Sequence, residues 1–219
     1  LALHSQKSNL FKKYSHTTIP NTLDLTIYTR LNKDDCRQKL NLPLNVPILL
    51  FVSENIQNHR KGFAHLINSI GDLQIPNLQL ACVGKFPENI DFMENLHFLG
   101  EIHDERMMAI AYNAADVFIL PSEEDNLPNV ILESLCTGTP VIAFPNSGAK
   151  EIIQNGINGM ITAEISSNSL SNAISTFFLS KEKYNNINIS TEAHVRFSRE
   201  KHNNSYLNIY KKLVNSNTG

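Results

Sequence analysis

Short apolar runs alternate with helix-like segments along most of this chain. The runs at 48–52 and 78–83 are continuously apolar, which is typical of strands buried on both faces of a parallel sheet. Strands are expected at 48–52, 78–83, 97–100, 117–120, 141–144 and 159–162. Because the connections are short, the pattern predicts right-handed crossovers and an α/β fold, a Rossmann-like parallel sheet of about six strands with helices on both faces.

Helical spacing fills the gaps between the expected strands. Asn32 can cap a short helix that has acidic residues in its first turn and basic residues in its last turn. Helices are expected at 32–40, 61–70, 103–113, 148–154 and 199–214, with another after Pro128. From Ala163 the pattern is helical to the end of the chain, so a helical C-terminal tail follows the sheet.

Three regions divide the chain. Residues 1–31 lack the regular alternation and are interpreted as the end of a preceding domain and a linker, in which Pro20 forces an extended or turn conformation. Residues 32–180 form the Rossmann-like domain, and residues 181–219 form the C-terminal helices. Because the first residue is Leu1 and not Met, we expect the chain to be a piece of a longer protein.

Composition narrows the class of protein. The chain has 219 residues, 42% of them hydrophobic and 18% charged, which is ordinary for a globular domain. The net charge of −2 gives neither a nucleic-acid footprint nor a polybasic membrane patch. The three cysteines lie far apart, so we expect buried free thiols and a protein that resides in the reducing cytoplasm. The histidines lack the spacing of a metal site, so we expect no bound metal.

The most informative stretch runs from Pro121 to Pro140. It contains the end of an expected strand, an acidic loop and the start of a helix, an arrangement that presents unpaired backbone N–H groups to an anion. Glu133 lies about one turn into that helix, where its carboxylate can accept hydrogen bonds from a pair of sugar hydroxyls. The stretch therefore predicts a pocket for a ligand with both phosphates and hydroxyls, such as a sugar nucleotide.

Other polar or glycine-marked loops are expected beside this stretch. Ligands of parallel α/β sheets bind at the carboxyl ends of the strands. The loops at 53–62, 84–87 and 121–128 all follow expected strands. In the second of these loops Gly84 is predicted to allow a close approach of the backbone near the ligand.

Several short motifs, taken together, resemble the donor-binding half of a retaining glycosyltransferase of the GT-B type, family 4, within the glycosyl transferases group 1. The most specific motif is the acidic pair Asp125 and Glu133, followed by the run 138–141 that reads Gly-Thr-Pro-Val. The other matching stretches are Ile19-Pro20-Asn21, Phe98-Leu99-Gly100 with Asp104, Ala115-Asp116-Val117 and Pro121-Ser122. The resemblance covers nearly the whole chain.

The resemblance implies roles for particular residues. Lys61 matches the family lysine that contacts the donor diphosphate and stabilises the departing charge. Glu133 matches the acid that holds the ribose hydroxyls, and Asp125 matches the acid beside the transferred sugar. We therefore expect Lys61 and Asp125 to be catalytic.

Further positions complete the implied nucleotide-sugar site. Backbone N–H groups near Asn129 and Val130 would add to the phosphate cradle. The backbone at Ile102 matches a position that meets the nucleobase. The family usually has Gly-Arg after the first strand, whereas this chain has Ser53 and Glu54. Either Arg60 replaces the missing arginine, or phosphate binding is weaker.

By resemblance, the protein is a glycosyltransferase of the hexosyltransferase type. It would transfer a sugar from a UDP- or GDP-linked donor to a saccharide or lipid-linked saccharide acceptor, with retention of configuration and no metal or other cofactor, in polysaccharide biosynthesis. The acceptor-binding half would precede Leu1, so the isolated chain is expected to be inactive. A cytoplasmic location, with peripheral contact to the inner face of the membrane through the missing half, is a further expectation.

Two other functions remain open from the sequence. A sugar-nucleotide epimerase shares the GT-B plan, although the spacing of Asp125 and Glu133 favours transfer. A non-catalytic sugar-nucleotide-binding module would explain why Glu54 stands where the family has arginine.

Overall fold

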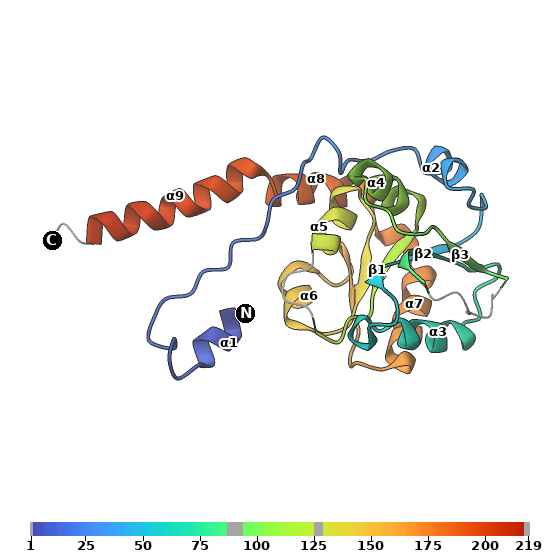
Figure 1. The fold of residues 1–219 in the computed structure, drawn as a ribbon, viewed down its shortest axis with the longest axis horizontal. Helices are drawn as coiled ribbons and strands as arrows, with labels where there is room; N and C mark the ends of the chain where they lie inside the picture. The colour runs from blue at the N-terminus through green and yellow to red at the C-terminus, as the bar shows by residue number, and fades with distance from the viewer. Residues whose placement is uncertain (1, 87–93, 125–128, 217–219) are drawn as a thin grey trace.

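A single six-stranded parallel sheet forms the centre of the computed structural model, which describes residues 2–86, 94–124 and 129–216 (Figure 1). The strand order is β3-β2-β1-β4-β5-β6, as in a Rossmann-type sheet. The strands are β1 Ile48–Asn55, β2 Gln79–Lys85, β3 Leu96–Phe98, β4 Val117–Leu120, β5 Val141–Ala143 and β6 Gly159–Ile161. The predicted α/β fold and all six predicted strands are confirmed.

Helices cover both faces of the sheet. The helices are α1 Ala2–Lys7, α2 Lys33–Lys39, α3 Phe63–Gly71, α4 Glu105–Ala114, α5 Asn129–Cys136, α6 Ser147–Ile152, α7 Ser167–Leu179, α8 Asn186–Arg196 and α9 Arg199–Ser216, with short 3₁₀ turns η1 His59–Lys61 and η2 Lys181–Lys183. Helices α2, α4, α5 and α8 pack together on one face, and α3 packs with α7 on the other (Figure 1). The predicted cap is present, because the Asn32 side chain accepts hydrogen bonds from the N–H groups of Asp34 and Asp35.

Several predicted boundaries differ from the structure by two or three residues, among them the end of β1 and the start of α3. Strand β1 continues past Val52 to Asn55, which pairs with Lys85, because backbone pairing with β2 outlasts the apolar run. Helix α3 begins at Phe63, two residues later than predicted, because Gly62 has a φ of +73° that a helix cannot contain. The C-terminal tail is helical as predicted, although it is divided into α7, η2, α8 and α9.

The core lies around the two central strands. Ile48 to Phe51 in β1 and Val117 to Leu120 in β4 are almost fully buried, which confirms strands covered on both faces. The three cysteines are free and buried, as the sequence predicts. Within the described residues, no helix is both long and apolar enough to cross a bilayer.

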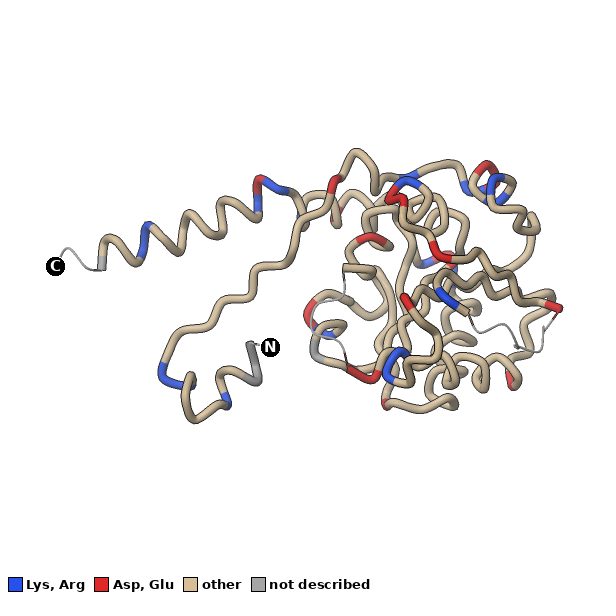
Figure 2. The backbone as a smooth tube through the Cα atoms, in the orientation of Figure 1, with Lys and Arg blue, Asp and Glu red and all other residues tan. Residues whose placement is uncertain are grey.

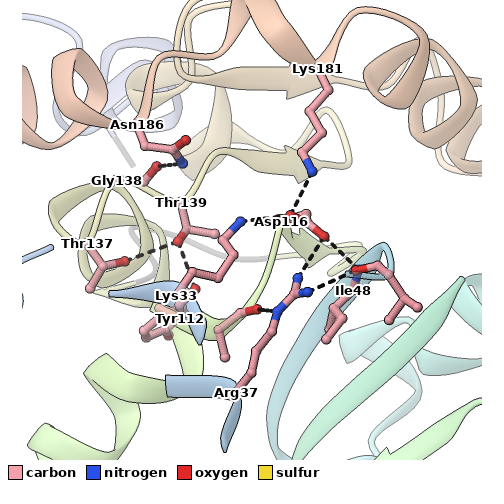
Figure 3. Close-up of polar contacts among 12 residues, drawn as sticks. Lys33, Arg37, Ile48, Tyr112, Asp116, Thr137, Gly138, Thr139, Lys181 and Asn186 are labelled. Carbon is pink, nitrogen blue, oxygen red and sulfur yellow. Dashed lines mark hydrogen bonds and ion pairs between the residues drawn. The ribbon is translucent and has the colours of Figure 1, made fainter. Parts of the chain in front are cut away.

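One buried carboxylate ties the amino edge of the sheet together. Asp116 precedes β4 and accepts hydrogen bonds from Lys33 Nζ (2.7 Å), Arg37 Nη2 (3.1 Å), Lys181 Nζ (2.8 Å) and the Ile48 N–H (2.8 Å) (Figure 3). These donors come from α2, η2 and the start of β1. Burial alone would raise the pKa of Asp116, but the neighbouring lysines outweigh burial and lower it to about 2.

The last helix extends away from the sheet. In Figure 1, α9 projects from the globular body, and the linker and α1 lie on the same side of the molecule. Several large apolar side chains of α9 are exposed, among them Leu207, Tyr210 and Leu213. Acidic and basic residues are interspersed along the described chain (Figure 2).

The Asp116 cluster predicts a pH dependence of stability. The pKa of this carboxyl is lowered from 3.8 to about 2 on folding, so its ionised form stabilises the fold above pH 3.8 and this contribution is lost as pH falls towards 2. We expect Asp116→Asn to lower the free energy of unfolding at pH 7 by about 2 kcal/mol or more.

Urea unfolding at several pH values would check this. The difference between the wild-type chain and Asp116→Asn should shrink as pH falls below 3.8, whereas the exposed-site control Asp72→Asn should change little. A difference that stays constant from pH 7 to pH 3 would contradict the assigned role.

Candidate active site

The strand order places the topological switch point of the sheet between β1 and β4. The chain proceeds from β1 to β2 and β3 on one side, then returns to β4, β5 and β6 on the other. At such a reversal the loops that follow the two central strands diverge, and open α/β sheets bind ligands there. The loops in question carry Lys61 after β1 and Pro121 after β4, so the sheet brings two of the predicted regions to one place.

These two loops are in direct backbone contact. The N–H of Glu123 donates a hydrogen bond to the carbonyl of Arg60 at 2.9 Å. A Cβ atom on Gly62 would lie only 1.9 Å from the carbonyl oxygen of Pro121, and Gly62 also has a left-handed φ of +73°. Only glycine fits this position without displacing backbone, so Gly62 fixes Lys61 beside the loop that leads into α5.

Gly84 plays a similar part between β2 and β1. A Cβ atom at Gly84, where φ is +135°, would lie 1.7 Å from the carbonyl oxygen of Ser53. The close approach predicted for Gly84 is therefore to the neighbouring strand. Its N–H also donates to the carbonyl of Gly100 at 2.9 Å, which draws the loop containing half-buried Ile102 to the same edge of the sheet.

Glu133 is half-buried on α5 and is oriented by a tyrosine. The hydroxyl of Tyr112, on α4, donates a 2.8 Å hydrogen bond to Oε2 of Glu133. Burial raises the pKa of Glu133, the bond from Tyr112 opposes that rise, and the nearby Glu105 adds to it. The pKa of the fully buried Tyr112 is itself raised well above its ordinary value, by burial and then by Glu133, so Tyr112 is the proton donor in this pair.

Several contacts hold the C-terminal end of α5. The Thr139 hydroxyl donates to the carbonyl of Tyr112 at 2.8 Å (Figure 3). The Ser134 hydroxyl donates to the carbonyl of Thr139 at 2.9 Å. The Asn186 side chain donates a hydrogen bond to the carbonyl of Gly138 (Figure 3). A Cβ atom added to Gly138 would lie 2.4 Å from the carbonyl oxygen of Asn186. The Gly-Thr turn after α5 is thus a joint between α4, α5 and α8.

The start of α5 contacts the linker. Asn129, the first residue of this helix, accepts a 2.8 Å hydrogen bond on Oδ1 from Nδ2 of Asn21. The carbonyl of Pro20 accepts a 2.8 Å bond from the ring of His202 on α9. The motif that resembles the interdomain linker is therefore fixed between the last helix and the N-terminus of α5, where Val130 is half-buried.

The remaining predicted residues can be placed in part. Arg60 is exposed in η1, next to half-buried Lys61. Asp125 and Pro128 lie outside the described residues, so their predicted roles are untested. Within the described residues, no group of three or more His, Cys, Asp or Glu side chains could hold a metal ion.

Sequence reasoning missed three residues near the site. Tyr112 and Tyr28 are buried close to Glu133. Burial is the main cause of the raised pKa of both phenols, and the charge of Glu133 raises it further. Ser122 is buried in the loop after β4, and its hydroxyl has no hydrogen-bond partner among the described residues. The sequence does place Tyr112 in an expected helix with an apolar face. A buried tyrosine hydroxyl usually needs a hydrogen-bond partner, so this position could have indicated a polar contact.

Two cavities lie away from Lys61 and Glu133. One of about 240 Å³ and one of about 310 Å³ lie along the linker, where Thr18, Pro20 and Arg196 line both. Neither cavity is lined by a residue predicted to bind the nucleotide sugar. The candidate site is therefore identified by the residues at the switch point and not by these cavities.

A family profile and curated proteins match this chain. The family profile described as glycosyl transferases group 1 matches residues 32–194. The lipopolysaccharide 1,2-N-acetylglucosaminetransferase of Salmonella typhimurium is 28% identical over 185 residues, which cover 76% of this chain and 48% of that protein. The chain spans less than half of the length of the first curated relatives it matches.

Solved structures share the fold. Sucrose-phosphate synthase from Thermosynechococcus elongatus has a TM-score of 0.81 and 24% identity, covering 98% of this chain and 56% of that chain. Anabaena Alr3699/HepE, in complex with UDP-glucose, has a TM-score of 0.74 and 23% identity, covering 90% of this chain and 57% of that chain. At these identities the likeness shows the shared fold.

The contact at Gly62 predicts a strong effect of a small substitution. Gly62→Ala would combine a left-handed φ with a clash against the Pro121 backbone, so we expect it to lower the free energy of unfolding by about 2 kcal/mol or more. Gly71→Ala is the matched control, because a Cβ atom at Gly71 meets nothing within 4 Å. The control should be neutral or stabilising by less than about 1 kcal/mol.

Chemical denaturation of the two variants would measure these differences. Equal stability of Gly62→Ala and Gly71→Ala would show that the loops after β1 and β4 are not held together as described.

Proposed function

This chain belongs to the glycosyl transferases group 1 family, and we propose that it is the donor-binding half of a retaining GT-B glycosyltransferase of family 4. Its fold is the one that forms half of such enzymes. The proposed reaction moves a sugar from a nucleotide diphosphate to an acceptor hydroxyl.

The observation that carries this proposal is the joined pair of loops at the switch point. The loop bearing Lys61 is held against the loop that leads into α5, and α5 carries a half-buried carboxylate, Glu133, whose orientation is fixed by Tyr112. A cation, a helix N-terminus and a fixed hydrogen-bond acceptor suit the diphosphate and the ribose of one nucleotide.

The roles follow the chemistry of each group. The ammonium of Lys61 and the first N–H groups of α5, near Asn129 and Val130, bind the diphosphate and stabilise its charge as the sugar departs. Glu133 accepts hydrogen bonds from the ribose hydroxyls. Asp125 lies beside the transferred sugar.

Other groups shape the rest of the pocket. The backbone at Ile102 meets the nucleobase, and Gly84 keeps β1 and β2 close enough for the loops to converge. The exposed guanidinium of Arg60, next to Lys61 in η1, replaces the family arginine in this proposal. In the transfer step, the acceptor attacks on the face from which the diphosphate leaves, so configuration is retained.

The donor is a hexose linked to UDP or GDP. A protein of the same fold, Anabaena Alr3699/HepE, is known in complex with UDP-glucose, which favours a uridine nucleotide. Cationic side chains and backbone amides neutralise the leaving diphosphate in this proposal, so no metal or organic cofactor is assigned a step.

The acceptor is a saccharide or a lipid-linked saccharide, as the lipopolysaccharide relative suggests. Residues 1–31 are the end of the acceptor-binding half and the linker, 32–180 the nucleotide-sugar domain and 181–219 the C-terminal helices. We place the protein in the cytoplasm, with peripheral contact to the membrane through the acceptor half.

One observation favours a second function. Glu54 is exposed at the end of β1, where the family has an arginine that contacts the diphosphate. A carboxylate there repels phosphate, so a non-catalytic module that binds the nucleotide sugar weakly is the alternative. Activity of the protein with its acceptor half distinguishes the two functions.

Calorimetric titration with UDP-glucose and GDP-mannose tests donor binding. Lys61→Ala should weaken binding of the preferred sugar nucleotide by roughly ten-fold or more, because a charge-assisted contact to the diphosphate is lost. Lys39→Ala, which removes the same charge from an exposed position on α2, should leave affinity unchanged. Equal affinities of both variants would exclude Lys61 from the site.

The isolated chain should transfer little or no sugar. The acceptor-side groups of a GT-B cleft belong to the other half, so incubation of the purified 219 residues with donor and acceptor should give no steady product formation. Sustained glycosyl transfer by this chain alone would disprove the proposed division into halves.

A further inference from the structure

Helix α5, which carries Glu133, is held at two points by one residue of α4. The Tyr112 hydroxyl donates a hydrogen bond to Oε2 of Glu133 at 2.8 Å. The carbonyl of Tyr112 accepts a bond from the Thr139 hydroxyl at 2.8 Å (Figure 3). Glu133 lies within α5, and Thr139 lies beyond its end. Tyr112 therefore fixes both the rotation of α5 and the direction of its carboxylate.

The side chain of Tyr112 is held by burial and by ring packing. This side chain is fully buried, and its ring packs edge-on against Phe118 of β4 with ring centroids 5.5 Å apart. Because Glu133 is the partner of this buried hydroxyl, the side chain of Tyr112 cannot turn away without leaving its hydroxyl unpaired. The hydroxyl acts as a fixed donor inside the helix layer.

We propose that Tyr112 is a positioning residue for nucleotide binding: its hydroxyl directs the Glu133 carboxylate so that the remaining oxygen faces the two ribose hydroxyls. This inference rests on the proposed role of Glu133. The carboxylate has two acceptor oxygens, and within the described residues only Oε2 has a partner, which is Tyr112. Tyr112 does not touch the ligand; it acts through Glu133.

Other titratable groups around Glu133 do not substitute for this bond. Burial raises the pKa of Glu133, and the charge of Glu105 on α4 raises it further, so both oppose ionisation. Glu133 also interacts electrostatically with Tyr28 of the linker and Cys136 of α5. His194 of α8 contacts these two residues, and its Nε2 donates to both of their carbonyls. The bond from Tyr112 is the contact that favours the ionised carboxylate.

The test compares ligands with and without ribose hydroxyls. UDP and 2′,3′-dideoxy-UDP are titrated into the full 219-residue chain and into Tyr112→Phe, with GDP and its dideoxy form used if GDP binds more tightly. We expect Tyr112→Phe to weaken UDP binding by roughly ten-fold and to leave the dideoxy nucleotide within about two-fold. Removing one oxygen keeps the ring packing on Phe118, so the variant should remain folded.

Thr139→Val is the matched control. It removes the hydrogen bond to the Tyr112 carbonyl and leaves the hydroxyl–carboxylate bond in place. This variant should lose stability while keeping the ratio of the UDP and dideoxy-UDP affinities. If Tyr112→Phe weakens both nucleotides equally, or weakens neither, the positioning role is overturned.

Two further measurements separate this inference from the proposed function. Glu133→Gln should weaken UDP but not dideoxy-UDP; if it changes neither, the ribose role of Glu133 fails. Carbon-13 NMR of the Glu133 carboxyl needs no ligand, and its titration midpoint should move to higher pH in Tyr112→Phe, because a bond to the charged form is lost. An unmoved midpoint would overturn the inference even where UDP binds.

Discussion

The close contact between the backbone of Gly62 and the carbonyl of Pro121 is the constraint on which the candidate site depends. Parallel strands bring the ends of β1 and β4 to one edge, but they do not fix the loops that follow. The glycine at the end of η1 lets the two loops meet, and the bond from Glu123 to Arg60 holds them. This contact fixes the position of Lys61 relative to the loop that follows β4.

The amino edge of the sheet contributes stability, whereas the carboxyl edge carries the candidate site. At the amino edge, Asp116 binds three cationic side chains and contributes stability without forming an open site. At the carboxyl edge, α5 is held from behind by Tyr112, Thr139 and Asn186, so its N-terminus and Glu133 point in a fixed direction. The rigid part of the molecule thus supports the part proposed to bind the nucleotide.

Much of this could be predicted from the sequence because apolar periodicity determines which segments are buried. The six strands, the cap at Asn32 and the grouping of loops at the carboxyl edge follow from local pattern. The end of β1 did not, because its last residues are polar and pair only through the backbone. The bond from Tyr112 to Glu133 joins residues 21 positions apart on two helices, so only the packed structure reveals it.

The most direct test of the account is a crystal structure of this chain with UDP bound. The account predicts that the diphosphate lies between the ammonium of Lys61 and the first turn of α5, with the ribose hydroxyls on Glu133. It would be contradicted by UDP bound elsewhere, or by a nucleotide that contacts either Lys61 or Glu133 but cannot reach both.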